Sequence, residues 1–127
     1  MKTIVVPEIE QLPEPSFLRV RVHSLRFQTE WLAADAYARA TGEAHWQRSV
    51  KTKLMTLVHE SEVMSVAESY RVVRLAQYVY RRASDVLHGR STLLAINALI
   101  VEDWERLIND LEKLHRTWRE TIGQAPS

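Results

Sequence analysis

An arginine-rich segment is the first part of this sequence that could support chemistry. Between Ser69 and Arg90, five arginines and three tyrosines accompany one acid, Asp85. These arginines and tyrosines are Arg71, Arg74, Arg81, Arg82, Arg90, Tyr70, Tyr78 and Tyr80. Guanidinium groups can hold phosphates, and tyrosine rings can stack on bases. Between Glu102 and Glu120, however, six acids stand against four bases, so the arginines could equally pair with an acidic helix of the same chain.

A histidine, His88, stands directly before Gly89 near the end of this segment. In a regular helix the seven steps from Arg81 to His88 advance about 700°, roughly 20° short of two full turns, so these two side chains share a face. Arg82 lies about 120° from that face. A histidine in the last turn of a helix also interacts favourably with the helix dipole and the free carbonyls. The spacing therefore leaves both a functional and a capping interpretation of His88 open.

The run from Tyr80 to Arg90 (YRRASDVLHGR) resembles the signature of the HEPN superfamily, small helical-bundle proteins named for higher eukaryotes and prokaryotes nucleotide-binding. The family's mark is an arginine followed, after four to six residues, by a histidine that often precedes glycine. Both Arg81 and Arg82 fall in this window. The commonest version has its arginine five positions before the histidine with asparagine next, whereas this chain has Ala83 and Ser84 there. The upstream order of a helix, a short break and a helix leading into the run is also similar to the family.

The resemblance implies RNA as the ligand and, as in family members that are ribonucleases, metal-independent cleavage in which the RNA 2′-hydroxyl attacks the adjacent phosphate. Arg81 would hold the scissile phosphate while His88 moves a proton, and neither role needs a metal ion or a cofactor. The other residues expected to contact RNA are Tyr80, Arg82, Ser84, Asp85 and Arg90. The family also implies a homodimer in which the Arg–His segments of two copies often face each other. A toxin-like or defence-associated role, with an antitoxin or another partner protein, follows from the same resemblance.

The alternative function is a non-catalytic helical subunit with the same fold. In that case the arginine-rich segment binds RNA or a protein without chemistry. A purely structural scaffold is a third class, in which charge reversal at Arg81 and Arg82 would leave every interaction unchanged.

Composition argues against several other classes of function. The 127 residues point to one domain, and the net charge of +1 gives no overall attraction to nucleic acid, so any basic face is local. The lack of cysteine excludes disulfides and thiolate catalysis, and three glycines without a phosphate-loop or Gly-x-Ser-x-Gly pattern disfavour nucleotide-loop enzymes and serine hydrolases. The histidines outside the segment lack metal-ligand spacing and are expected at the surface. They are His23, His45, His59 and His115.

The hydrophobic pattern predicts an all-α bundle of four to five helices. We expect an extended N-terminal arm at 1–15, a single helical domain at 16–123 and a flexible tail at 124–127. No 18-residue apolar run occurs, so neither a secretory signal nor a membrane span is expected, and the location is taken as cytoplasmic. The predicted helices run from Ser16 to Thr41, from about Ala44 to His59, from a Ser65 cap to near His88, and from Ser91 to Ile122 with a break near Asn97 or Glu102 or an extension into a partner.

Apolar side chains at steps of three and four define the expected inward faces. In the first helix these are Leu18, Val22, Leu25, Thr29, Leu32 and Ala36, although the run FLRVRVHS also alternates like a strand. In the second they are Trp46, Val50, Leu54, Leu57 and Val58. In the third they are Val66, Tyr70, Val73, Gln77 and Tyr80, widened by Val72, Leu75, Ala76 and Val79. In the last helix Trp104 and Trp118 lie fourteen residues apart on one face, which is consistent with packing in the core and also with a dimer seam.

Overall fold

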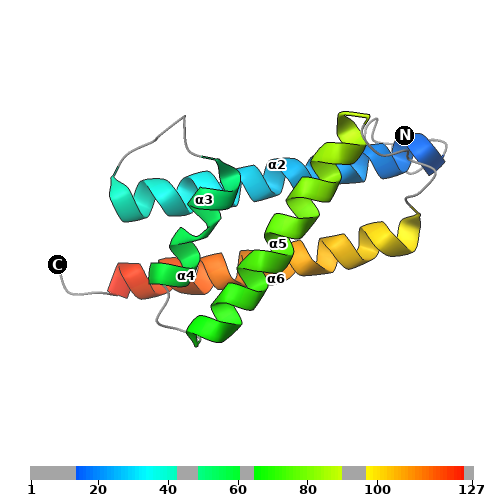
Figure 1. Ribbon diagram of the computed structural model, residues 1–127. Coiled ribbons are helices and arrows are strands. Elements are labelled where there is room, and N and C mark those ends of the chain that lie inside the picture. Colours follow the sequence, from blue (N-terminus) through cyan, green and yellow to red (C-terminus); the bar gives the residue numbers. More distant parts are fainter. Residues whose placement is uncertain (1–13, 43–48, 61–64, 90–96, 125–127) are drawn as a thin grey trace, which may run out of the picture.

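The computed structural model describes residues 14–42, 49–60, 65–89 and 97–124 of the chain. They form α2 (Glu14–Thr41), α3 (Val50–Leu54), α4 (Thr56–Glu60), α5 (Val66–Leu87) and α6 (Ala98–Gln124), and these residues contain no strand (Figure 1). The predicted all-α bundle is confirmed. None of the described helices has the length and apolar character needed to cross a membrane.

The long helices α2 and α6 lie side by side and run in the same direction (Figure 1). Their side-chain contacts show the same register: Arg21 Nε donates to Glu105 Oε2 at 3.0 Å and Gln28 Nε2 donates to Glu112 Oε2 at 2.7 Å, each pair being 84 residues apart. Helix α5 crosses both diagonally, and the short helices α3 and α4 pack against α2 and α5 (Figure 1). One face of α5 is therefore covered by α2 and α6, and α3 and α4 contact α5 as well.

The first helix has the predicted inward face. All six residues of its stripe are buried, and the Thr29 hydroxyl donates to the Leu25 carbonyl at 2.8 Å. The alternating segment FLRVRVHS is helical, and its residues Leu18 and Val22 are buried in the helical core rather than against a second strand. Helix α2 begins at Glu14, two residues before the predicted start, and ends where Gly42 adopts a positive φ of 74°. The rest of the predicted arm lies outside the described residues.

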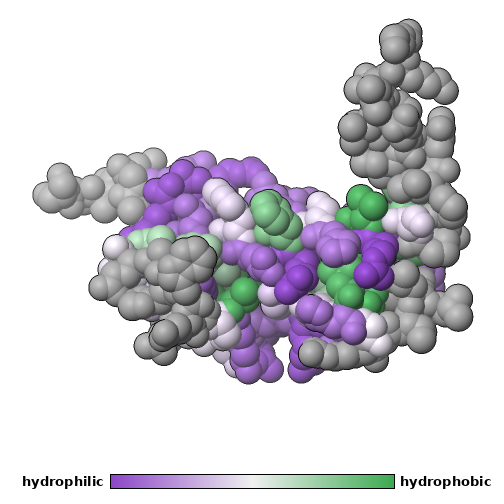
Figure 2. Space-filling model, turned by 90° about the horizontal axis from the view of Figure 1, so that it is seen from above, coloured by the Kyte–Doolittle hydropathy of each residue, from purple (hydrophilic) through white to green (hydrophobic). Residues whose placement is uncertain are grey.

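The outward side of α2 is not purely polar. Val20, Phe27 and Trp31 are exposed there. Seen from above, apolar side chains interrupt the hydrophilic surface of the molecule (Figure 2). Helix α2 thus carries apolar residues on both sides, unlike an ordinary amphipathic surface helix.

The predicted second helix is wrong as a single element, because it is divided at Met55. Ser49 caps α3 by accepting from Thr52 N–H at 3.1 Å, and the Met55 N–H bonds the Thr52 carbonyl at 3.2 Å, three residues back. This tighter bond replaces the four-residue spacing of a continuous α-helix, so α3 and α4 are separate single turns. The inward residues are nevertheless correct where they are described: Leu54, Leu57 and Val58 are buried, and Val50 is half-buried. Trp46 lies outside the described residues.

Helix α5 begins and ends as predicted. Ser65 accepts from Glu68 N–H at 3.1 Å, but the Glu68 carboxylate accepts from Arg71 at 2.6 Å instead of completing the capping box. His88 follows the helix as its C-cap, and Gly89 has a φ of 73°. The predicted inward face is partly wrong: it is rotated, so Val66 and Tyr70 are 66% and 46% exposed. The buried face of α5 consists of Ser69, Val72, Val73, Ala76, Val79, Ala83 and Val86.

The last helix begins at Ala98, and the preceding Asn97 accepts from Ile100 N–H at 3.0 Å. Asn97, one of the two positions at which a break in the last helix was predicted, is thus the N-cap of α6. The residues of that predicted helix before Asn97 lie outside the described part of the chain. Trp104 and Trp118 are only 4% and 2% exposed, within the core. Core packing of these tryptophans is confirmed, and the alternative dimer seam through them is wrong because both side chains are buried in the core of the single chain.

Candidate nucleic-acid interface

A groove of about 640 Å³ lies between α3 and α5, on the side of α5 away from the core. Lys51 of α3 and Arg74 and Arg81 of α5 line it. Four of the residues predicted from sequence lie along this groove, namely Tyr80, Arg81, Ser84 and Asp85. The structure therefore brings part of the arginine-rich segment to one concave surface and adds a lysine that the sequence analysis did not single out.

Two of the groove arginines lie over tyrosine rings of the same helix. The guanidinium of Arg74 is 5.9 Å from the ring centre of Tyr70, and that of Arg81 is 5.9 Å from the ring centre of Tyr78. Neither Arg74 nor Arg81 has an ion pair or a hydrogen bond among the described residues. Their N–H groups are thus available to an anion, and the exposed rings beside them offer flat surfaces.

The acidic helix α6 does not neutralise these arginines. Where α6 carboxylates form ion pairs with described residues, the partners are Arg21, Arg106 and Arg116, which belong to α2 or to α6 itself. The described ion pair of α5 joins Arg71 to Glu68 on the same helix. Pairing between the arginine-rich segment and the acidic helix, one of the two interpretations of the charge pattern, is therefore not found at Arg74 or Arg81.

Two polar atoms in the wall of the groove are buried without a partner. Gln77 donates from Nε2 to the Lys51 carbonyl at 3.0 Å, which ties α5 to α3, but its Oε1 accepts no hydrogen bond from the described residues. The hydroxyl of Ser84 is also buried and unpartnered in this part of the chain. Unsatisfied buried polar atoms are costly, so both gain from a ligand that hydrogen-bonds them.

Tyr80 is held by α2 rather than left free for a ligand. Its hydroxyl donates to Glu30 Oε1 at 2.8 Å, and the Arg26 guanidinium lies 5.7 Å from its ring centre. Burial, reinforced by the hydrogen bond to Glu30, raises the pKa of Tyr80 above its ordinary value. Its hydroxyl bonds α5 to α2, so this group is already engaged within the chain.

The described structure shows no contact between the two predicted catalytic side chains. Arg81 leans over Tyr78, one turn nearer the start of α5, and this is the direction away from His88. His88 is exposed and does not line the groove. Its backbone N–H donates to the Ser84 carbonyl at 2.9 Å. The helix is regular up to Leu87, so Arg81 and His88 share a face about 10.5 Å apart along the axis.

The remaining predicted contacts are placed differently. Arg82 is half-buried, does not line the groove, and has a buried Nε without a hydrogen-bond partner among the described residues. Arg90 lies outside the described residues. Neither residue is brought to the groove by the described part of the structure.

A buried polar pair between α2 and α6 was not predicted from the sequence. The predicted surface position of His115 is wrong: the residue is 3% exposed, and its Nε2 lies 2.7 Å from Asp35 Oδ2. Its ring packs between Trp31 and Trp118, with ring centres 5.8 and 5.9 Å away. Burial lowers the pKa of His115 despite the opposing carboxylate. The position of His115 between Leu111 and Trp118 on the heptad-like stripe was the available signal.

Burial alone would raise the pKa of Asp35. Hydrogen bonds from Arg39 Nε, at 2.9 Å, and from His115 outweigh burial and bring this pKa below its ordinary value. Asp35 therefore stays ionised beside a neutral imidazole at neutral pH.

Among the described residues, no group of three or more histidines and carboxylates is arranged to hold a metal ion. A scan against models of protein families matched none to this chain, and searches of curated proteins and of solved structures matched nothing either. Functional inference therefore depends on the groove and on the resemblance in the run from Tyr80 to Arg90.

Proposed function

We propose that this chain is an HEPN-like RNA-binding domain that holds single-stranded RNA in the groove between α3 and α5. The observation that supports this most is the state of Arg74 and Arg81, which face the groove without carboxylate partners in the described structure. Both lean on exposed tyrosines, an arrangement suited to phosphate binding beside base stacking.

The groove offers separate contacts for backbone and bases. Arg74 and Arg81 are two turns apart, about 10.5 Å along the helix, so they would contact different phosphates. Lys51 on the opposite wall would neutralise a third. Gln77 and Ser84 would hydrogen-bond base edges or riboses with the polar atoms that otherwise lack partners.

Binding is tested by fluorescence anisotropy with a short fluorescein-labelled single-stranded RNA over a range of salt concentrations. Each of Arg74→Ala and Arg81→Ala should reduce the slope of log affinity against log salt by about 0.7. Tyr78→Ala should weaken binding by about 5- to 150-fold, the loss of one stacking contact. Arg106→Ala, which removes an exposed arginine of α6 outside the groove, is the matched control.

The proposal is wrong if the wild-type chain shows no saturable RNA binding. It is also wrong if Arg106→Ala weakens binding as much as Arg81→Ala, because attraction would then be a property of total charge. Thermal melts of each variant separate loss of binding from loss of fold.

The narrower form of the proposal is RNA cleavage by a cytoplasmic homodimer of a toxin or defence system, with an antitoxin as a candidate partner. Because Arg81 leans away from His88 within one chain, a cleavage site would combine Arg81 of one copy with His88 of the second. This arrangement agrees with the facing Arg–His segments that the family resemblance implies.

Cleavage is tested by incubating RNA with the protein in the presence of a chelator. Arg81→Ala and His88→Ala should each abolish cleavage while remaining folded. A mixture of these two variants should restore it, since a mixed dimer contains one centre with both side chains. Wild-type protein that binds RNA without cutting it would instead favour the non-catalytic subunit.

A further inference from the structure

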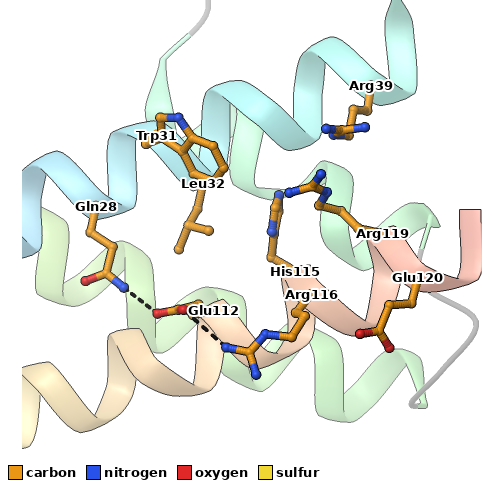
Figure 3. A pocket seen from close by; sticks show the side chains of 9 residues that line it. All are labelled: Gln28, Trp31, Leu32, Arg39, Glu112, His115, Arg116, Arg119 and Glu120. Carbon is orange, nitrogen blue, oxygen red and sulfur yellow. Dashed lines mark hydrogen bonds and ion pairs between the residues drawn. The ribbon is translucent and has the colours of Figure 1, made fainter. Parts of the chain in front are cut away.

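A second cleft, of about 660 Å³, lies between α2 and α6 and shares no residue with the groove proposed for RNA. Trp31, Leu32 and Arg39 of α2 form one wall, and His115 and Arg119 of α6 form much of the other (Figure 3). Neither the proposed RNA contacts nor the predicted cleavage residues use this surface.

Two guanidinium groups converge at one end of the cleft. The side chains of Arg39 and Arg119 reach from opposite helices into the space beside His115 (Figure 3). Arg39 donates to Asp35 at 2.9 Å, whereas Arg119 has no ion pair or hydrogen bond among the described residues. Asp35 already serves both Arg39 and His115, so no described carboxylate is paired with Arg119 at this end.

The positive charge of Arg119 acts on the neighbouring His115. Burial is the main cause that lowers the pKa of His115, and the positive charges of Arg119 and Arg39 lower it further. Asp35 opposes them. A bound anion between the two arginines would relieve this repulsion.

An aromatic surface lies at the other end of the same wall. The indole of Trp31 is 51% exposed and is held edge-on to the His115 ring, with an angle of 64° between the planes. Buried Leu32 lies beside it in the cleft (Figure 3). An exposed tryptophan fixed by a buried neighbour offers a flat apolar platform at low entropic cost.

The carboxylates in the cleft limit the charge of the occupant. Glu112 accepts a hydrogen bond from Gln28 Nε2 at 2.7 Å, and its charge is neutralised by Arg116 at 3.2 Å. Glu120 is exposed and has no ion pair in the described part of the chain, so it would repel additional negative charge. The cleft thus suits one oxyanion of single charge and disfavours a phosphate monoester or a polyanion such as RNA.

We propose that the cleft between α2 and α6 binds an aromatic carboxylate. Its carboxylate lies between Arg39 and Arg119, where the planar guanidinium groups match the planar anion. Its ring lies against Trp31 and Leu32. This site is independent of the RNA groove, and its test is independent of RNA binding.

The probe is 1-naphthoate, compared with the neutral 1-naphthamide and with the doubly charged 1-naphthyl phosphate. Binding is followed by NMR through the Trp31 indole N–H and by calorimetry. We expect saturable binding of 1-naphthoate and at least about tenfold weaker binding of the amide and the phosphate, a difference of about 1.4 kcal/mol or more. The pKa of His115 should rise when 1-naphthoate binds, a response that a merely structural arginine pair would not produce.

Arg119→Gln is the main variant because it breaks no described ion pair. It should weaken 1-naphthoate at least about tenfold while leaving the thermal midpoint and RNA binding unchanged. Trp31→Ala should weaken 1-naphthoate and the amide alike, and Arg106→Gln is the control for a lost exposed charge. Absence of saturable binding, equal binding of acid and amide, tighter binding of the phosphate, or full binding by Arg119→Gln would each overturn the proposal.

Discussion

Acid should destabilise this fold through His115 at a higher pH than through Asp35. Burial at 3% exposure lowers the pKa of His115 from its ordinary value of 6.5, so the folded chain keeps the ring neutral after the unfolded chain has begun to take up a proton. A depressed folded pKa means that stability is complete above about pH 6.5 and falls as the pH drops from there towards the folded pKa.

The magnitude follows from the number of protons. One proton taken up by the unfolded chain alone costs about 1.4 kcal/mol per pH unit, so the free energy of unfolding should be lower by up to about 1.4 kcal/mol at a pH one unit below 6.5. Asp35 adds its own loss at lower pH. Its pKa lies below 3.8, so the stability it provides is present above that value and is lost as the pH falls through the folded pKa.

The assay is urea unfolding over a pH series, for wild type, His115→Gln and His23→Gln. Glutamine at 115 keeps an N–H donor for Asp35 but does not titrate, so the variant should lose the decrease between about pH 7.5 and 5.5. The His23→Gln variant, which replaces an exposed histidine, should keep the same decrease in stability as the wild type. The reasoning is refuted if His115→Gln keeps the wild-type pH dependence, or if NMR titration gives His115 a pKa of 6.5 or higher.

The remaining predictions concern stability. Leu54→Ala removes a fully buried side chain and should cost about 2–5 kcal/mol in chemical unfolding, whereas Leu99→Ala on the surface should cost less than about 0.5 kcal/mol. Ser69→Ala should raise stability by about 1 kcal/mol, measured as a higher thermal midpoint, because it removes a buried hydroxyl without a hydrogen-bond partner; a lower midpoint would contradict this. Tyr80→Phe should cost about 0.5–1.5 kcal/mol by urea unfolding through loss of the bond to Glu30, and equal stability would show that this bond contributes nothing. Because the pKa of Tyr80 is raised, its contribution should be complete below pH 10.0 and lost as the pH rises through the folded pKa, and Tyr80→Phe should lack that alkaline loss.

The fold was predictable wherever local periodicity decides burial. The stripe from Leu18 to Ala36 is buried throughout because it follows the helical period over five turns. The cap at Ser65 and the end at Gly89 were predictable because both are local hydrogen-bond or backbone requirements. Helix existence, caps and most inward residues therefore follow from short-range chemistry.

The errors arose where two faces compete or where a contact is distant in sequence. Helix α5 has apolar residues at Val66 and Tyr70 and also at Val72 and Val79, and only packing against α2 and α6 selects the second set. The division at Met55 has no sequence signal such as proline or glycine, so tertiary packing of two short turns determines it. These features depend on which helices meet, which periodicity does not specify.

The candidate sites divide in the same way. Arg81, Ser84 and Asp85 share the groove because spacings of three and four residues fix them on one helix face. Lys51 joins them from a helix about thirty residues earlier, which spacing cannot reveal. The bond between Asp35 and His115, 80 residues apart, is equally invisible to local analysis.

The parallel register of α2 and α6 accounts for the partners of two carboxylates of α6. Glu105 and Glu112 are seven residues apart, as are Arg21 and Gln28. Each of these two residues of α2 therefore pairs with the residue of α6 at the same level along the two helices. This ladder directs those α6 carboxylates towards α2 and away from the outer face of α5. Arg74 and Arg81 have no carboxylate partner in the described structure, although the chain as a whole is nearly neutral. Lys51, Arg74 and Arg81 thus concentrate positive charge at the groove between α3 and α5.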